Sequence, residues 1–239
     1  MGDPPVALAP VSYLWDHFVV AIDGPSGSGK SSTSRGVADR LGLRYLDTGA
    51  MYRAMTWWML RQGVDVHDAV AVAARCGEPQ LESGTDPLAP TITVDGQDVA
   101  TAIREPDVNA AVSPVSAVPQ VRARLLDIQR SAIDAALAGP GIVVEGRDIG
   151  SVVWPEAPVK VYLSADASAR ATRRAAEEGG SDVESTRESL LARDQIDTGR
   201  TVSPLVMAEG AVHIDTTAYS LDEVIDRVVA LVGAVRSRA

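Results

Sequence analysis

The stretch from residue 18 to residue 31 reads FVVAIDGPSGSGKS, and it decides the fold. An apolar segment, Phe18 to Asp23, runs directly into GPSGSGKS, and a helical pattern follows from Ser32 to Leu41. This spacing fits Gly-x4-Gly-Lys-Ser in the strand, loop and helix context that the motif requires. Glycines let backbone N–H groups converge on phosphate oxygens, and the helix adds its positive N-terminus. We therefore predict a loop that binds the phosphates of a nucleotide.

Two side chains of this loop have defined roles in such motifs. Lys30 would bridge the β and γ phosphates of ATP, and the Ser31 hydroxyl would ligate Mg²⁺. The chain contains two lysines, Lys30 and Lys160, and one of them stands where the loop needs it. A plain Gly-rich turn is the alternative, whereas a dinucleotide loop fails because the glycines do not give Gly-x-Gly-x-x-Gly. The predicted ATP-binding residues of the loop are Gly24, Pro25, Ser26, Gly27, Ser28, Gly29, Lys30, Ser31 and Ser32.

Composition limits the other classes of function. The chain has 239 residues, 46% of them apolar, and a net charge of -10. This charge argues against binding to polymeric nucleic acid or to an anionic membrane, since phosphate neutralisation needs clustered lysines and arginines. Cys76 is the single cysteine, so no intrachain disulfide is possible. Without a signal peptide or an apolar span, we expect a cytoplasmic enzyme. We also expect it to act on small molecules and to be a monomer.

Short apolar runs alternate with helical patterns along the chain, which predicts an α/β fold. We expect a P-loop NTPase-type five-stranded parallel sheet with helices on both faces. Residues 1–17 are expected to form a flexible extension, and residues 18–239 a single domain. The predicted strands are Phe18 to Asp23, Arg44 to Leu46, Ile142 to Glu145, Val159 to Leu163 and Ala211 to Ile214.

Two segments depart from this alternation. Within residues 64–112, the part after residue 78 is rich in Pro, Gly and Thr. It carries two β-like pieces, Thr91 to Val94 and Asp98 to Ala100, across the turn dipeptide Asp95-Gly96. We predict an inserted subdomain there. Residues 170–200 are rich in charge and interrupted by two glycines, which is typical of a mobile helical flap.

Arginine motifs beyond the loop point to a second phosphate. DTGAMYR (47–53) follows the second strand, with Asp47 or Thr48 as the helix cap, and EGRDIG (145–150) ends a buried strand. Arg193, Asp197 and Arg200 are spaced i, i+4 and i+7, which predicts one helix face. Taken singly, these motifs could be a capped helix with a surface arginine or an exposed ion-pair ladder. Neither lysine lies in Asn-Lys-x-Asp, which disfavours a GTPase switch, so a small-molecule kinase is favoured.

At this point the chain resembles the bacterial-type cytidylate kinases. The motifs that carry the resemblance stand in that family's order from about residue 18 to residue 236. VDGQDVATAIREPDV resembles the insert that separates the bacterial type from shorter relatives. The remaining motifs are GPSGSGKSS, YLDTGAMYR, VSAVPQVR, EGRDIGSVVWP, ARDQIDTGR with TVSPL, and HIDTT.

The resemblance implies ATP-dependent phosphorylation of CMP and dCMP in pyrimidine metabolism, with Mg²⁺. It implies that Arg53, Arg147 and Arg200 hold the acceptor phosphate, with Lys30 as a fourth catalytic residue. The remaining implied roles are Thr48 beside the phosphate, Ser113, Arg122 and Asp148 on cytosine, Arg193 and Asp197 on the ribose, and Arg170, Arg173 and Arg174 on the ATP phosphates.

The chain departs from the family pattern at two positions. Glu145 stands where relatives commonly have Asp, which leaves its part in the Mg²⁺ water shell open, and Ser31-Ser32 stands where they often have Gly-Thr. The alternatives to a CMP kinase are another small P-loop kinase and a nucleotide-binding regulatory module without catalysis. Arginine-rich acceptor motifs favour a phosphorylated acceptor, and intact Lys30 and Ser31 disfavour an inactive module.

Overall fold

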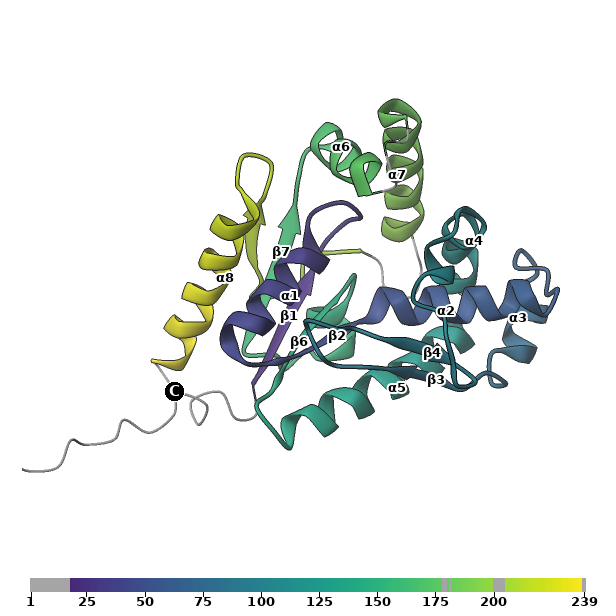
Figure 1. Cartoon of the computed structure of the whole chain (residues 1–239), viewed down its shortest axis with the longest axis horizontal. Coiled ribbons are helices and arrows are strands. Elements are labelled where there is room, and N and C mark those ends of the chain that lie inside the picture. The colour runs from purple at the N-terminus through teal and green to yellow at the C-terminus, as the bar shows by residue number, and fades with distance from the viewer. Residues whose placement is uncertain (1–17, 178–179, 181, 200–204, 238–239) are drawn as a thin grey trace, which may run out of the picture.

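The central strand of the molecule is β1 (Val19–Asp23), in which all five residues are buried. It belongs to a five-stranded parallel sheet with the order β2-β6-β1-β7-β8 (Figure 1). The computed structural model describes residues 18–177, 180, 182–199 and 205–237. All five predicted strands are confirmed to within one residue at each end. The other four strands are β2 (Arg44–Asp47), β6 (Ile142–Gly146), β7 (Val159–Ser164) and β8 (Val212–Asp215).

Helices cover both faces of this sheet, as a parallel arrangement requires. Alternate residues of β1 point to opposite faces, so Val20 and Ile22 pack on one side while Val19 and Ala21 pack on the other. The first face is covered by α1 (Lys30–Leu41) and α8 (Leu221–Arg236). The second face is covered by α2 (Thr48–Arg61) and α5 (Pro119–Leu137).

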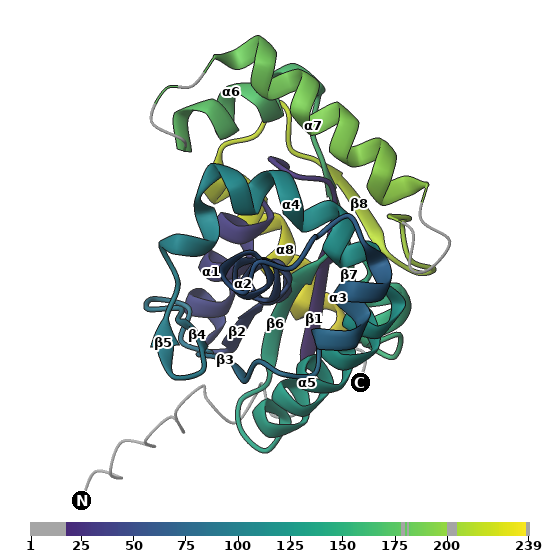
Figure 2. The ribbon, with the colours of Figure 1, turned by 90° about the vertical axis from the view of Figure 1, so that its right-hand side faces the viewer.

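A second, antiparallel sheet lies beside α2 and contains β3 (Leu81–Ser83), β4 (Ile92–Val94) and β5 (Gln97–Asp98) (Figure 2). Asp95 and Gly96 both have positive φ, 51° and 78°, so the predicted hairpin turn is confirmed. The position of its second strand was wrong, because pairing begins at Gln97 directly after the turn and has ended by Ala100.

This second sheet does not form a separate core. Ile92 and Val94 belong to the same apolar cluster as α2 and the strand residue Val19. The helices that flank this sheet in the sequence are α3 (Ala69–Arg75), the short η2 (Ala102–Arg104) and α4 (Pro106–Ala117). Shared packing therefore ties the second sheet to the main fold.

The charged segment after β7 forms α6 (Ala167–Glu177) and α7 (Val183–Thr198), which pack together beyond the carboxyl ends of the strands (Figures 1 and 2). Arg193 and Asp197 both lie on α7, as the spacing predicted. The helix ends at Thr198 with Gly199 as its cap, and Arg200 lies outside the described residues. Within the described ranges, none of the helices combines the length and apolar character that a membrane crossing needs.

Candidate active site

The phosphate-binding loop follows β1 and closes tightly on itself. A side chain at Gly24 would bring its Cβ within 2.1 Å of the Leu163 carbonyl oxygen, and Gly27 has a φ of +75°. Both positions therefore require glycine. The Ser28 hydroxyl and the Lys30 ammonium group donate to the Pro25 carbonyl at 2.9 and 2.7 Å. The Lys30 donors thus rest on the loop itself and are available for a phosphate.

The second strand ends at the cavity beside this loop. Asp47 caps α2 by accepting from the Ala50 N–H at 2.9 Å, and the next residue, Thr48, donates to the Glu145 carbonyl at 2.7 Å. These bonds fix the first turn of α2 against β6. Arg53, one turn further along, lines the cavity and donates to the Asn109 side chain of α4.

The segment after β6 is held by a buried carboxyl group. Asp23 is 3% exposed and accepts from the backbone N–H groups of Ile149 and Gly150, each at 2.8 Å. Burial raises the pKa of Asp23 to about 6. These bonds anchor η3 (Ile149–Val153), and they place Arg147 and Asp148 at the edge of the sheet.

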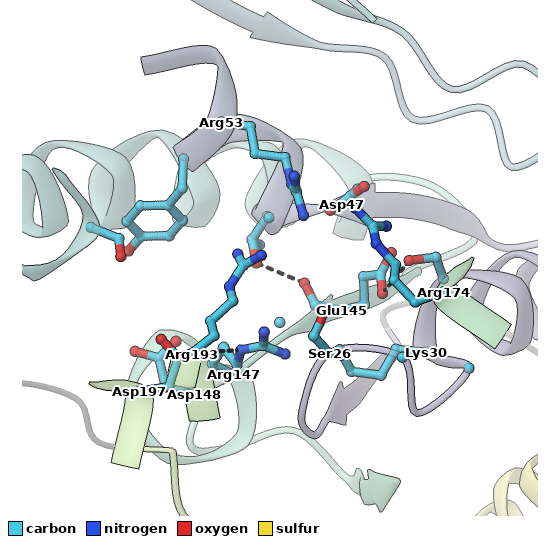
Figure 3. A pocket seen from close by; sticks show the side chains of 18 of the residues that line it. Ser26, Lys30, Asp47, Arg53, Glu145, Arg147, Asp148, Arg174, Arg193 and Asp197 are labelled. Carbon is cyan, nitrogen blue, oxygen red and sulfur yellow. Dashed lines mark hydrogen bonds and ion pairs between the residues drawn. The ribbon is translucent and has the colours of Figure 1, made fainter. Parts of the chain in front are cut away.

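Two ion pairs line the cavity, and Figure 3 labels Arg147, Asp148 and Asp197 of these pairs. Arg147 Nε donates to Asp197 at 2.8 Å, and Arg147 Nη1 donates to the Gly24 carbonyl at 2.6 Å. Arg122 pairs with Asp148 in a site where both side chains are less than a tenth exposed. The Arg122 guanidinium also lies 5.4 Å from the centre of the Tyr52 ring. A charged, directional pair buried in this way is suited to reading the polar edge of a ligand.

The structure brings most of the predicted residues to one cavity of about 230 Å³. Ser113 lines a second, larger cavity of about 1190 Å³ between α4 and α7, which shares Arg174 and Arg193 with the first. The predicted residues that line the first cavity are Ser26, Gly27, Gly29, Lys30, Ser31, Ser32, Thr48, Arg53, Arg122, Arg147, Asp148, Arg174, Arg193 and Asp197.

Two of the three flap arginines have partners elsewhere. Arg170 pairs with Asp194 of α7 at 2.5 Å and donates to the Ser26 carbonyl at 3.2 Å. Arg173 donates to the Thr216 hydroxyl and carbonyl at 2.9 and 2.8 Å. In this state only Arg174 of the three lines the cavity. Gly24, Pro25 and Ser28 shape the loop without lining the cavity.

The cavity concentrates positive charge. Burial and the nearby Arg147 lower the pKa of Arg193 to about 9, and burial and Arg174 lower the pKa of Arg53 to about 10. Arg193 Nε is buried without a hydrogen-bond partner among the described residues. Burial and Arg147 also lower the pKa of Lys30. Clustered cations with depressed pKa values favour an anionic ligand, which would relieve their mutual repulsion.

Several lining residues were not predicted as site residues. Arg104, which the sequence presents only as part of the insert motif, lies at the end of η2 and adds a further arginine to the cavity. The sequence feature that could have indicated Arg104 is a single basic residue within an otherwise acidic segment, IREPDV. The other lining residues that the sequence did not assign are Asp47, Gly49, Tyr52, Ser116, Glu145 and Gly146.

The oxygen donors at the loop fit Mg²⁺. Ser31 Oγ lies 3.0 Å from Glu145 Oε2, and both residues line the cavity. The described residues contain no group of three His, Cys, Asp or Glu side chains that could hold a metal alone. Mg²⁺ in phosphoryl-transfer sites is held by one or two protein oxygens together with phosphates and water, so this sparse donor set is sufficient.

Together, the parallel sheet, the loop with Lys30 and the opposed arginine cluster define a small P-loop kinase with a phosphate-bearing acceptor. The sequence profile of the cytidylate kinase family matches residues 20–234. The chain is 57% identical to "Cytidylate kinase" of Streptomyces avermitilis over 219 residues, or 92% of this chain and 94% of that protein. It is 58% identical to the protein of that name from Streptomyces coelicolor, with the same coverage. The chain belongs to the cytidylate kinase family.

Solved structures show a similar fold at low identity. An uncharacterized protein from Eubacterium ventriosum ATCC 27560 matches with a TM-score of 0.51 and 10% identity, covering 92% of this chain and 99% of that protein. At this identity the likeness concerns the fold alone.

Proposed function

We propose that the protein transfers the γ-phosphoryl group of ATP to CMP and dCMP, giving ADP and CDP or dCDP. The observation that carries this proposal is the shared cavity, in which the phosphate-binding loop faces an arginine cluster and a buried Arg122–Asp148 pair. Family membership supports the same acceptor.

The donor side uses the loop. Lys30 would leave the Pro25 carbonyl and bind the β and γ phosphates, while backbone N–H groups from Gly27 to Ser32 cradle them. Ser31 would hold Mg²⁺, whose charge neutralises the phosphate oxygens during transfer. Arg170, Arg173 and Arg174 are proposed for the ATP phosphates, and Arg174 already lines the cavity.

The acceptor side uses the arginines. Arg53, Arg147 and Arg200 would hold the monophosphate, with Thr48 beside it. Arg147 is engaged by Asp197 and by the Gly24 carbonyl, so CMP would have to displace contacts that already hold the guanidinium in place. Arg193 and Asp197 would then bind the ribose.

Base choice would depend on the edge of cytosine. Its exocyclic amine can donate to Asp148, and its N3 and O2 can accept from Arg122. Uracil offers a carbonyl and an N–H at the corresponding positions, so both contacts become repulsive. Ser113 lies on the neighbouring cavity wall and would complete the base contacts.

Transfer itself requires positioning and charge neutralisation more than proton removal. The attacking phosphate oxygen of CMP is ionised at neutral pH, so no strong general base is needed. The side chains would align this oxygen with the γ phosphorus, and closure of α6 and α7 would exclude water and limit ATP hydrolysis. The extension at 1–17, the inserted subdomain, the monomeric state and the cytoplasmic location stay predictions.

A coupled assay of ADP release with CMP, dCMP, UMP, AMP, GMP and shikimate tests this function. CMP and dCMP should give the highest kcat/KM. A preference for another acceptor would show a different small P-loop kinase, and the absence of turnover with tight nucleotide binding would show a regulatory module.

A further inference from the structure

Glu145 connects the phosphate-binding loop to the second strand. Its side chain lies at the carboxyl end of β6, and the residue is only 2% exposed. The two carboxylate oxygens have different partners: Oε2 accepts from Ser31 Oγ at 3.0 Å, and Oε1 accepts from the Tyr45 hydroxyl. Three side chains from α1, β2 and β6 therefore form one continuous hydrogen-bonded chain.

The position of Tyr45 follows from the sheet register. Tyr45 pairs with Val143, and Asp47 pairs with Glu145, on the parallel strands β2 and β6. Because side chains alternate between faces, Tyr45, Val143 and Glu145 all point toward the face that α1 covers. The Tyr45 ring packs in the apolar cluster under α1 and α8 and is 2% exposed. Its hydroxyl is thus fixed by packing, and Glu145 is the partner that satisfies it.

A serine hydroxyl has one proton and two acceptor lone pairs. When Ser31 donates its proton to Glu145, the lone pairs of Ser31 Oγ are left for a cation in the cavity. A Glu145 carboxylate that could rotate would no longer hold the Ser31 proton in this direction. The orientation of Ser31 therefore depends on what holds Glu145.

We propose that Tyr45 is a positioning residue for the Mg²⁺–nucleotide site: it holds Glu145 so that Glu145 orients the Ser31 hydroxyl toward the cation. This inference rests on the proposed function, in which Ser31 ligates Mg²⁺. Tyr45 itself stays in the core and contacts neither the metal nor the nucleotide.

The test is the affinity for ATP without acceptor, measured by calorimetry with Mg²⁺ and with EDTA. Tyr45→Phe removes the hydroxyl and keeps the ring in the core. It should weaken Mg²⁺–ATP binding about tenfold, as expected for a lost bond to a charged group, and change metal-free ATP binding less than about twofold. Tyr219→Phe is the matched control, because it removes a tyrosine hydroxyl beside the same apolar cluster. It should leave both affinities unchanged.

A second variant shows whether Tyr45 acts through Glu145. Glu145→Gln should produce the same metal-selective loss, and the double variant should lose no more than Glu145→Gln alone. If Glu145→Gln leaves Mg²⁺–ATP binding unchanged, Glu145 does not orient Ser31, and the proposal is overturned even if Tyr45→Phe does not fold. Equal weakening of metal-free and Mg²⁺-bound ATP, or additive losses in the double variant, would overturn it.

A failure of the proposed function can be distinguished from a failure of the proposal about Tyr45. If the wild-type protein binds Mg²⁺–ATP but does not phosphorylate CMP, the acceptor assignment is wrong while the role of Tyr45 stands or falls on the calorimetry. If wild-type ATP affinity does not respond to Mg²⁺, the role of Tyr45 is overturned too.

Discussion

Asp148→Asn should remove most of the discrimination between CMP and UMP. Asp148 is 5% exposed and is held by Arg122, so its carboxylate is desolvated where the cytosine amine would arrive. A hydrogen bond to a charged group contributes about 1.5–3 kcal/mol, which corresponds to about 10- to 150-fold in kcat/KM. CMP should lose efficiency by this factor.

UMP should lose much less, because the amide can rotate to present its donor to the uracil carbonyl. We expect the wild type to prefer CMP by about a hundredfold or more, and the variant to prefer it by less than about tenfold. The assay is ADP release with each acceptor at saturating Mg²⁺–ATP. The ratio of the two kcat/KM values does not depend on how much of the protein is folded.

Asp194→Asn is the matched control for this experiment. It also removes a carboxylate from an ion pair with a buried arginine, Arg170, but Asp194 does not line the cavity that Asp148 lines. It should leave the ratio of CMP to UMP unchanged. If Asp148→Asn lowers both substrates by the same factor, or if the wild type uses UMP as well as CMP, Asp148 does not read the base.

Three further outcomes are expected. Lys30→Ala should lower kcat by about two to four orders of magnitude with an unchanged circular dichroism spectrum, because a transition-state charge contact is lost; near-normal turnover would refute the loop assignment. Asp197→Ala should raise the Kd for CMP and leave the Kd for ATP nearly unchanged in titrations; equal losses would reject a sugar contact. Asp23, with its pKa raised to about 6, binds more protons folded than unfolded between about pH 4 and 6. The stability of the wild type relative to Asp23→Asn should therefore increase, by up to about 3 kcal/mol, as pH falls from 7 to 4 in urea unfolding; a constant difference would contradict this.

The main sheet was predictable because each of its strands is a short apolar run beside a recognisable motif. The second sheet was harder to predict from the sequence. β3 is only Leu81-Glu82-Ser83, and three residues with one buried side chain give no periodic signal. The helix α7 ends at Thr198 with Gly199 as its cap, so the part of the predicted helix face at Arg200 stays a prediction.

In the candidate site, too, some residues could be predicted from the sequence and others could not. Lys30, Ser31 and most of the arginines lie in motifs whose chemistry is local, so the sequence alone predicted them as site residues, and the structure brings most of them to one cavity. Asp23 and Tyr45 act through contacts with segments more than 90 residues away in the chain. No local pattern distinguishes an aspartate that ends a strand from one that anchors a distant helix. Such roles depend on the sheet order, which places β1 and β2 on either side of β6.

Because the chain contains so few lysines, chemical modification of Lys30 can be followed in the intact protein. Apart from the N-terminal amine, the chain offers acylating reagents two primary amines, Lys30 and Lys160. Burial and Arg147 lower the pKa of Lys30, so a larger share of it is the neutral, nucleophilic amine at a given pH. ATP would cover that amine. The yield of acylated Lys30 in mass spectrometry, relative to Lys160, would therefore report nucleotide occupancy in the unaltered protein.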